Sequence, residues 1–256
     1  MILMSFKFSH LGDYAHSHGF IFKKIFKIAL LIFIVLAIVW SFVLKKPIYQ
    51  HLYGKPYSGS LTVYEKDIFE SLHVQPASVV VKGSNFAVQL IFLKHYRTTS
   101  KIVYVDRYNP VGTWYRGDRF SYIYDKLVPL DISTVSGKTA QPVILKHFDF
   151  SHEYRLLRSE SERWNELFVR DDINNNHIIP ANKNIAIALE ILKKGDIAYM
   201  EGYLVHIKGL GNDKNFELKS ALMAGEISHQ KAGGQTTGLC RIIYLTKITF
   251  DGYIFE

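Results

Sequence analysis

The stretch NNNHIIPANKNIAIALEILKKGDIAYMEGYLV, residues 174–205, carries the clearest information on how this chain folds. It joins a polar segment containing His177, an Ile-Ile-Pro step, a helix-like segment and a strand-like segment. The spacing predicts a helix over Asn184–Lys194, because apolar residues recur at i, i+3, i+4 and i+7 on one face, namely Ile185, Ala188, Leu189 and Leu192. The rest of the chain can be interpreted outward from this helix.

Residues at both ends of the predicted helix support it. Asn182 is a suitable N-cap residue, since its side chain can accept a hydrogen bond from an unpaired N–H group of the first turn, and Pro180 fits just upstream. Lys193, Lys194 and Gly195 suit the C-terminal end.

Most other segments resemble strands, since they are short and rich in β-branched and aromatic residues. They are LTVYE (61–65), ASVVVKG (77–83), NFAVQLIFL (85–93), KIVYVDRY (101–108), IAYMEGYLVHIKG (197–209) and LCRIIYLTKITF (239–250). Residues 111–132 continue in the same style, whereas residues 151–172 suggest a short helix or a surface excursion. The expected class is α+β, mostly β, with one or two helices beyond the N-terminal apolar run.

The run KKIFKIALLIFIVLAIVWSFVLKK, residues 23–46, predicts a transmembrane helix. Residues 28–44 contain no charged side chain, and at about 1.5 Å per residue they would span roughly 26 Å, close to the thickness of a hydrocarbon core. Lysines at both ends can reach the headgroups, and Trp40 lies where an interfacial ring is expected. No small-residue cleavage site follows, so the run is interpreted as an uncleaved anchor.

This interpretation divides the chain into residues 1–27 as a cytoplasmic tail, 28–44 as the span, 45–60 as a linker and 61–256 as a β-rich extracytoplasmic domain. The orientation rests on a slight excess of lysine before the run and on the small size of the tail. The expected location is the inner membrane of a bacterial cell, single-pass, with the C-terminal domain in the periplasm.

Charge and cysteine content exclude some classes of protein. The net charge is +8, but no run of Lys or Arg is longer than two residues, so nucleic acid is not expected as a partner. Cys240 is the only cysteine, which excludes an internal disulfide and a Cys-x-x-Cys motif. The expected partners are the lipid bilayer, through residues 28–44, and a protein or another component of the envelope.

Motifs for cofactor chemistry are weak, and no cofactor or metal is predicted. SGKT, residues 136–139, lacks the glycine that a phosphate-binding loop would have at Ile132. KHFDFSHE, residues 146–153, contains metal-capable side chains, but the spacing of its two histidines would turn them to different faces of a strand. Cys240 lies in an apolar run and is interpreted as a buried thiol and not a nucleophile.

His177 has two interpretations. It could serve a site, because unpaired N–H groups of the loop and of the following helix can receive an anion or a carbonyl group. Alternatively, His177 and the neighbouring asparagines order the loop by hydrogen bonds to its backbone. The second interpretation is preferred on the sequence alone.

The second half of the chain resembles a group of uncharacterised bacterial membrane-anchored proteins. The pattern is His-x-Ile-Pro-Ala, Gly-Asp, Gly-x-Leu-Val, Ser-x-Leu and Thr-Gly with a nearby Cys, and its positions here include His177, Ser220, Thr237 and Cys240. Arg241 departs from it, since an acidic residue is expected after the cysteine. The resemblance carries no known activity and implies that His177, Ser220 and Thr237 converge in space.

Two classes of function follow. The first is a membrane-anchored extracytoplasmic binding or scaffold protein of the bacterial envelope, with no catalytic residue. The second is a small-ligand-binding or hydrolytic site around His177, Ser220 and Thr237, with Asn182 as a further ligand-binding candidate. Convergence of these side chains in one polar cleft would favour the second class.

Overall fold

The computed structural model describes residues 11–64, 66–72, 78–83, 85–108, 118–153, 155–167, 169–221 and 239–256. Its helices are α1 (Leu11–Val39), η1 (Trp40–Leu44), α2 (Lys45–Tyr53), α3 (Arg119–Leu127), α4 (Pro142–Leu145), α5 (Trp164–Leu167), η2 (Arg170–Asp172), α6 (Lys183–Ile191) and η3 (Gly211–Asp213). Its strands are β1 (Lys55–Pro56), β2 (Ile68–Ser71), β3 (Ser78–Lys82), β4 (Ala87–Arg107), β5 (Leu130–Val135), β6 (Asp149–Glu153), β7 (Leu156–Glu160), β8 (Ile173–Pro180), β9 (Ile197–Gly209), β10 (Glu217–Lys219), β11 (Leu239–Phe250) and β12 (Tyr253–Phe255). The fold is α+β and mostly β, as the sequence predicts.

The chain separates into two compact units, Met1–Ile48 and Tyr49–Glu256. In the first unit, α1 is followed without a break by η1, a short π-helix. No helix in the described part of the chain is both long enough and apolar enough to qualify as a membrane-crossing helix. Residues 45–60, expected as a linker, begin with helix α2.

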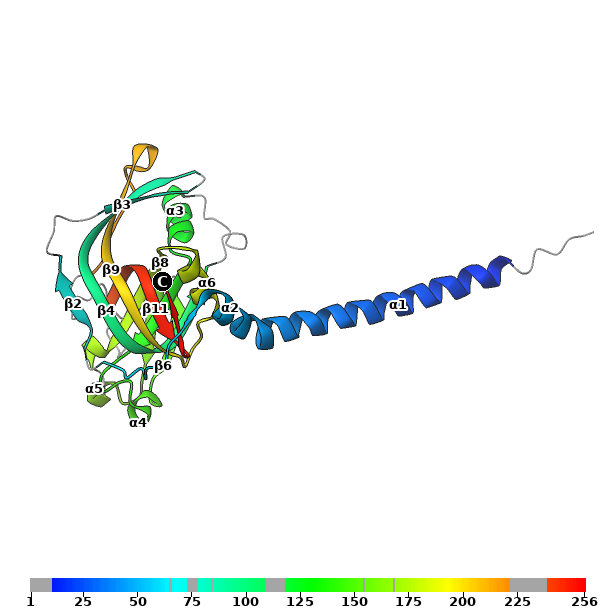
Figure 1. Ribbon diagram of the computed structural model, residues 1–256, viewed down its shortest axis with the longest axis horizontal. Helices are drawn as coiled ribbons and strands as arrows, with labels where there is room; N and C mark the ends of the chain where they lie inside the picture. Colours follow the sequence, from blue (N-terminus) through cyan, green and yellow to red (C-terminus); the bar gives the residue numbers. More distant parts are fainter. Residues whose placement is uncertain are drawn as a thin grey trace, which may run out of the picture. The chain divides into compact units, whose positions relative to one another are not determined.

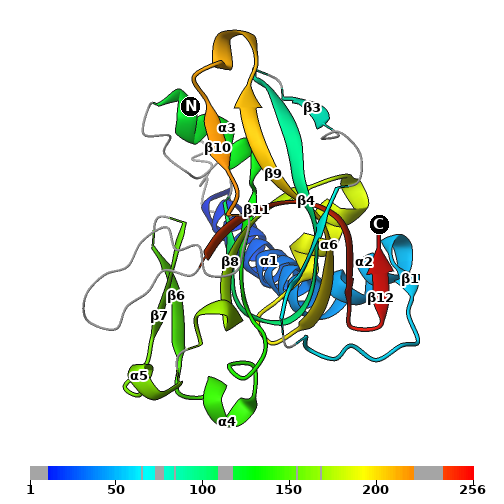
Figure 2. The same cartoon turned by 90° about the vertical axis from the view of Figure 1, so that its left-hand side faces the viewer.

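Five strands of the second unit close into a ring (Figures 1 and 2). β4 pairs with β5, β5 with β8, β8 with β11, β11 with β9, and β9 returns to β4. Only the β8–β11 pair in this ring is parallel. In sequence order, helix α6 lies between the third and fourth of these strands, β8 and β9. A closed five-stranded barrel of this kind resembles the oligonucleotide/oligosaccharide-binding (OB) fold. Such a fold hosts many functions, so the function has to be argued from its sites.

The length of β4 makes closure possible. This strand has 21 residues and pairs with β9 from Val88 to Lys101 and with β5 from Lys101 to Arg107. Irregularities between Phe92 and Lys94 and between Ile102 and Tyr104 interrupt its register, and such bulges bend a strand. The sequence predicts two separate strands at 85–93 and 101–108, and this is wrong, because the polar residues between them continue the same strand.

The barrel interior is apolar at the end that α6 covers. Inward-facing side chains of all five strands pack there against the buried face of the helix; they include Ile102, Ile132, Ile178, Leu204, Ile243, Ile185, Ala188 and Leu189. Asn182 caps the helix, with its side-chain oxygen 3.0 Å from the nitrogen of Ile185. The predicted helix and its N-cap are therefore confirmed, although α6 ends at Ile191.

An ion pair also lies inside the barrel. Arg241 on β11 is fully buried, and its guanidinium bonds the carboxylate of Asp67 and lies 3.0 Å from the Tyr96 hydroxyl. Asn174 donates to the same Asp67 carboxylate at 3.2 Å. Residues 66–72, which lead into β2, are thereby attached to β8 and β11 through buried polar contacts.

Three expectations about secondary structure fail, and a fourth, for residues 151–172, holds in part. Residues 61–64 form no strand, and residues 111–132 contain helix α3, whose N-terminus is capped by Asp118 through the Ser121 nitrogen at 2.7 Å. Residues 151–172 contain most of the β6–β7 hairpin as well as the short helix α5. The polar segment 174–177 belongs to strand β8 and not to a loop. In each case, tertiary partners outweigh local preference.

Candidate functional site

Side chains from three strands of the barrel meet on its outer face. Asp131 on β5 pairs in register with His177 on β8, and His177 pairs in turn with Ile242 on β11. Cys240 lies two residues before Ile242, and because side chains alternate along a strand, it faces the same way as His177. The strand register thus brings together a carboxylate, an imidazole and a thiol that are far apart in the sequence.

His177 contacts both of the other groups. Its Nδ1 lies 2.7 Å from Oδ1 of Asp131, and the side chain of Cys240 is close enough to raise the pKa of the ring. His177 is 4% exposed and Asp131 is fully buried, whereas Cys240 is partly exposed. A nucleophile, a base and a group that orients the base are the components of an activated cysteine.

Electrostatics favour a charged histidine in this position. Burial acts to lower the pKa of His177, but the Asp131 carboxylate opposes it, and Asp131 together with Cys240 raises the pKa to about 9. The imidazole is therefore protonated at neutral pH. An imidazolium beside a thiol stabilises the thiolate, which is the nucleophilic form of cysteine.

Arg155 contacts the same carboxylate oxygen of Asp131 as the histidine does. Its Nη1 lies 3.2 Å from Oδ1 of Asp131, and its Nη2 lies 2.7 Å from Oδ1 of Asp125 and 2.9 Å from the carbonyl oxygen of Val128. The guanidinium stacks on two rings, 3.5 Å from the centroid of Tyr108 and 4.3 Å from that of Tyr124. Such contacts fix the position of Arg155.

Tyr108 and Tyr124 also belong to this cluster. Burial and the nearby Asp131 carboxylate raise the pKa of both phenols, so both stay protonated. The Tyr108 hydroxyl is within hydrogen-bonding distance of Oδ2 of Asp131, at 2.9 Å, and of Oδ2 of Asp106, at 3.0 Å. The Tyr124 ring meets the His177 ring edge-on at 5.8 Å. Asp131 is thus in contact with three possible donors, on His177, Arg155 and Tyr108.

A second histidine lies in the neighbouring part of the same face. Nε2 of His152 is 2.5 Å from Oγ of Ser133, and its ring packs on Tyr104 at 4.7 Å. Burial lowers the pKa of His152, which keeps this imidazole neutral at neutral pH. The sequence places side chains that could bind a metal in this segment. In the structure, the His152 ring contacts the protein side chains of Ser133 and Tyr104.

Asn175 lies next to the thiol. Its Nδ2 donates to the carbonyl oxygen of Arg155 at 2.9 Å and is 3.9 Å from Sγ of Cys240. Its buried Oδ1 has no hydrogen-bond partner among the residues that the structure describes. An amide beside a nucleophile can donate to the oxyanion that forms when a carbonyl group is attacked.

Of the site residues expected from the sequence, the structure describes His177, Asn182 and Ser220, and no hydrogen bond joins these three side chains to one another. Asn182 serves as the N-cap of α6. The Ser220 hydroxyl accepts from the nitrogen of Ile242 and donates to the carbonyl oxygen of Ala221, both at 3.0 Å, so it acts as a backbone brace beside β11. Thr237 lies outside the described residues. His177 bonds the Asp131 carboxylate and not the backbone of a loop, whereas Asn175 and Asn176 donate to backbone carbonyl oxygens of other segments.

Sequence reasoning missed Asp131, Arg155 and Tyr108, and it assigned Cys240 to the core. One signal was available, since Asp131 is a lone carboxylate within the buried strand LDISTV, where an unpaired charge is costly. The partner of that carboxylate is 46 positions away, and only the strand register reveals it.

No protein-family model, no curated protein and no solved structure matches the chain.

Proposed function

We propose that this chain is a membrane-anchored envelope protein whose β-rich unit carries out thiol-dependent acyl chemistry at Cys240. The observation that carries the chemical part is the position of His177 between the Asp131 carboxylate and the Cys240 thiol. The substrate class is a carboxylic acid derivative, an ester or an amide.

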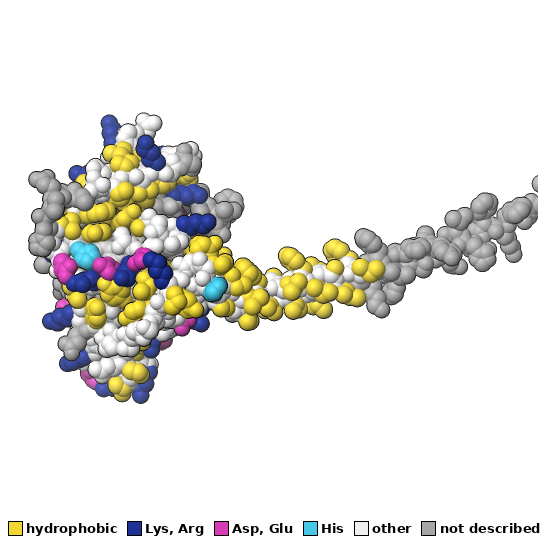
Figure 3. Space-filling model, viewed as in Figure 1, with side chains coloured by type: hydrophobic (Ala, Val, Ile, Leu, Met, Phe, Trp, Pro, Cys, Tyr) yellow, Lys and Arg dark blue, Asp and Glu magenta, His cyan; other side chains and the backbone are white. Residues whose placement is uncertain are grey.

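The anchor rests on the apolar run of residues 28–44. Large apolar side chains of the first unit are exposed, among them Phe33 at 69% and Leu36 at 61%, and hydrophobic atoms dominate the described part of this unit in Figure 3. Exposed apolar surface of this extent is unfavourable in water and favourable in a bilayer. We infer that the second unit lies outside the cytoplasm. A reporter fused after Glu256 should be active when exported, and activity confined to the cytoplasm would reject this orientation.

The chemistry that the cluster supports has two stages. With the thiol proton on Nε2 of His177, the sulfur attacks the carbonyl carbon and forms a C–S bond, while the leaving group departs with that proton. Water then gives a proton to Nε2 and its hydroxide attacks the thioester carbon. The C–S bond breaks, the carboxylic acid leaves, and the thiolate again faces an imidazolium.

The test is the pH dependence of alkylation by iodoacetamide. Because Cys240 is the only cysteine, the modification of the full chain in detergent reports on this thiol alone. We expect rapid alkylation well below the ordinary thiol pKa of about 8.5. His177→Gln and Asp131→Asn should shift the profile toward that value.

A matched control is available in His206, whose ring bonds Glu217 at 2.6 Å on an exposed part of the β9–β10 pair. His206→Gln should leave the alkylation profile unchanged. If His177→Gln has the same alkylation profile as wild type, the proposal that the thiol is activated is rejected.

A second candidate function is non-catalytic binding by an envelope scaffold. One observation favours it: Asp131 has donors from His177, Arg155 and Tyr108, so the cluster satisfies its own charges as a structural network would. Under this alternative, Cys240→Ser should keep biological function. Under the thiol mechanism, the same substitution should abolish function while the protein stays folded.

A further inference from the structure

The interior of the barrel is polar at the end opposite α6. Strand β8 leads into α6, so Asn174 and Asn176, near the start of β8, lie at the end away from the helix. Arg241 pairs with Asn176 in the parallel register of β8 and β11, and it therefore lies at the same end. These three side chains share the inner side of the sheet with core residues such as Ile243, because side chains alternate along a strand. Asp67 completes the group through its contacts with Arg241 and Asn174.

The guanidinium of Arg241 uses only part of its hydrogen-bonding capacity. Its Nη1 makes both of its bonds, to the Asp67 carboxylate and to the Tyr96 hydroxyl at 3.0 Å. Its Nε and Nη2 are buried and have no partner among the residues that the structure describes. These two nitrogens carry three N–H groups. Buried polar groups in folded proteins are nearly always hydrogen-bonded, so the three N–H groups indicate a further partner.

Three oxygen atoms of the same group are also buried and without a partner in the described ranges, namely Oδ1 of Asp67, of Asn174 and of Asn176. The orientation of both amides is fixed by their neighbours. Nδ2 of Asn174 faces the Asp67 carboxylate at 3.2 Å, and Nδ2 of Asn176 faces the carbonyl oxygen of Ile132 at 3.1 Å. Both neighbours only accept hydrogen bonds, so a nitrogen has to face them. Three N–H groups and three acceptor oxygens thus belong to one buried group without bonding one another.

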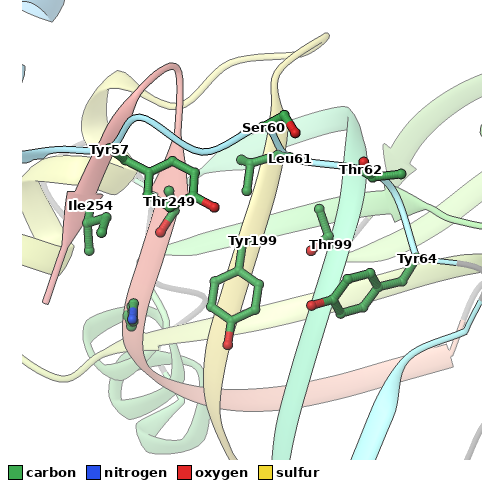
Figure 4. Close-up of a pocket in the computed structure, with 10 residues that line it drawn as sticks. Tyr57, Ser60, Leu61, Thr62, Tyr64, Thr99, Tyr199, Thr249 and Ile254 are labelled. Carbon is green, nitrogen blue, oxygen red and sulfur yellow. The ribbon is translucent and has the colours of Figure 1, made fainter.

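The outer surface of the barrel differs in this respect. A pocket of about 350 Å³ lies there between residues 57–64 and three strands (Figure 4). Among its described lining residues, none has a fully buried side-chain nitrogen or oxygen without a hydrogen-bond partner. The group inside the barrel has five such atoms.

The charges of this interior group decide which kind of molecule can bridge these atoms. Arg241 and Asp67 neutralise each other, so the group has no net charge. An anion would suit the N–H groups but would be repelled by the three oxygens, and a cation would be repelled by the guanidinium. A neutral molecule that both donates and accepts hydrogen bonds suits all six positions. Water is the smallest molecule of this kind.

We propose that the group formed by Asp67, Asn174, Asn176 and Arg241 binds internal water molecules, which accept from the three N–H groups and donate to the three oxygens. A buried water makes about three hydrogen bonds, so six positions correspond to about two waters. These waters join strand β8, strand β11 and residues 66–72 to one another. The site lies on the inner side of β11 and is independent of the thiol chemistry at Cys240.

The test is NMR cross-relaxation between water protons and the side-chain N–H protons of Arg241 and Asn176, measured on the full chain in detergent. A long-lived bound water gives cross-peaks of opposite sign in the laboratory and rotating frames, whereas proton exchange gives the same sign in both. Arg163 is the matched control, because its side chain is 50% exposed and its Nε donates to Glu166 at 3.0 Å. We expect long-lived water at Arg241 and Asn176 and not at Arg163. Absence of these cross-peaks at Arg241 would overturn the proposal.

The double variant Arg241→Met with Asp67→Leu identifies the groups that hold the water. It removes the N–H groups together with both charges, so the cross-peak between water and Asn176 should be lost while the fold is kept. A cross-peak of unchanged strength would reject the role of Arg241. The wild-type measurement decides the matter if this variant does not fold. Release of a small organic molecule in equimolar amount on denaturation, detected by mass spectrometry, would also overturn the proposal, because that molecule and not water would occupy the site.

Discussion

The pair formed by His177 and Asp131 should make the stability of the protein depend on pH in a specific window. The pKa of His177 is raised from 6.5 to about 9 in the folded state, because the attraction of Asp131 and the contact with Cys240 outweigh the effect of burial. The folded state therefore holds the proton more tightly than the unfolded state does. The resulting stabilisation is fully present below pH of about 6.5 and is lost as the pH rises through about 9.

The size of this effect follows from the shift. A pKa shift of about 2.5 units for one group corresponds to a free energy of roughly 3 kcal/mol at 25 °C. This is a large part of the 5 to 15 kcal/mol by which domains are typically stable. Arg155 also contacts Asp131, so part of the stabilisation of the carboxylate persists after His177 loses its proton.

The assay is urea unfolding of the full chain in detergent at several pH values from about 6 to 9.5, for wild type and for His177→Gln. Other groups titrate in this range, so the informative quantity is the difference between the two proteins. We expect the wild type to be more stable at pH 6 and this advantage to shrink by roughly 3 kcal/mol by pH 9.5.

Ser220→Ala is the matched control for this experiment. It leaves the nitrogen of Ile242 without a partner and should cost about 1 to 3 kcal/mol, but it removes no titratable group. Its free energy of unfolding should therefore run parallel to that of wild type across the whole range. If the curve of His177→Gln is also parallel, His177 does not carry a shifted pKa and the reasoning is wrong.

Three further predictions concern the barrel, and urea or thermal unfolding checks each of them. Arg241→Met should cost about 3 to 5 kcal/mol because it leaves Asp67 buried without its cation, and adding Asp67→Leu should recover most of that loss. Asn182→Ala should cost about 1 kcal/mol, since it removes the N-cap of α6, and a loss below a few tenths would contradict the capping role. Gly202→Ala should destabilise the barrel by more than about 2 kcal/mol, because its new Cβ would lie 2.2 Å from the carbonyl oxygen of Tyr244. If the variant is as stable as wild type, the two strands can move apart at little cost in free energy.

The regular parts of the fold were predictable from local patterns. Strands 197–209 and 239–250 have the residue types that favour extended chain, and both appear with the predicted bounds. Helix α6 was predictable because one apolar face and one cap residue define it. These features depend on residues that are neighbours in the sequence, so no tertiary information is needed.

Strand β8 was not predictable in the same way. Its three consecutive asparagines favour turns, yet all three are buried. Their amides donate to Asp67, to the backbone of Arg155, and to Ile132 and Thr134. Since each of these partners lies on another segment of the chain, local preference gives the wrong answer, and the strand forms only in the completed barrel.

The positions of Cys240 and Arg241 follow from the alternation of side chains along β11. Adjacent residues of a strand face opposite sides, so Arg241 points into the barrel toward Asp67 while Cys240 lies on the outer face with His177. An arginine in place of the acidic residue expected after the cysteine therefore puts its charge inside the barrel, where Asp67 balances it. The thiol cluster has its own ions, Asp131 and Arg155, on the other side of the sheet. For this reason, the departure of residue 241 from the expected pattern does not count against a functional site at Cys240.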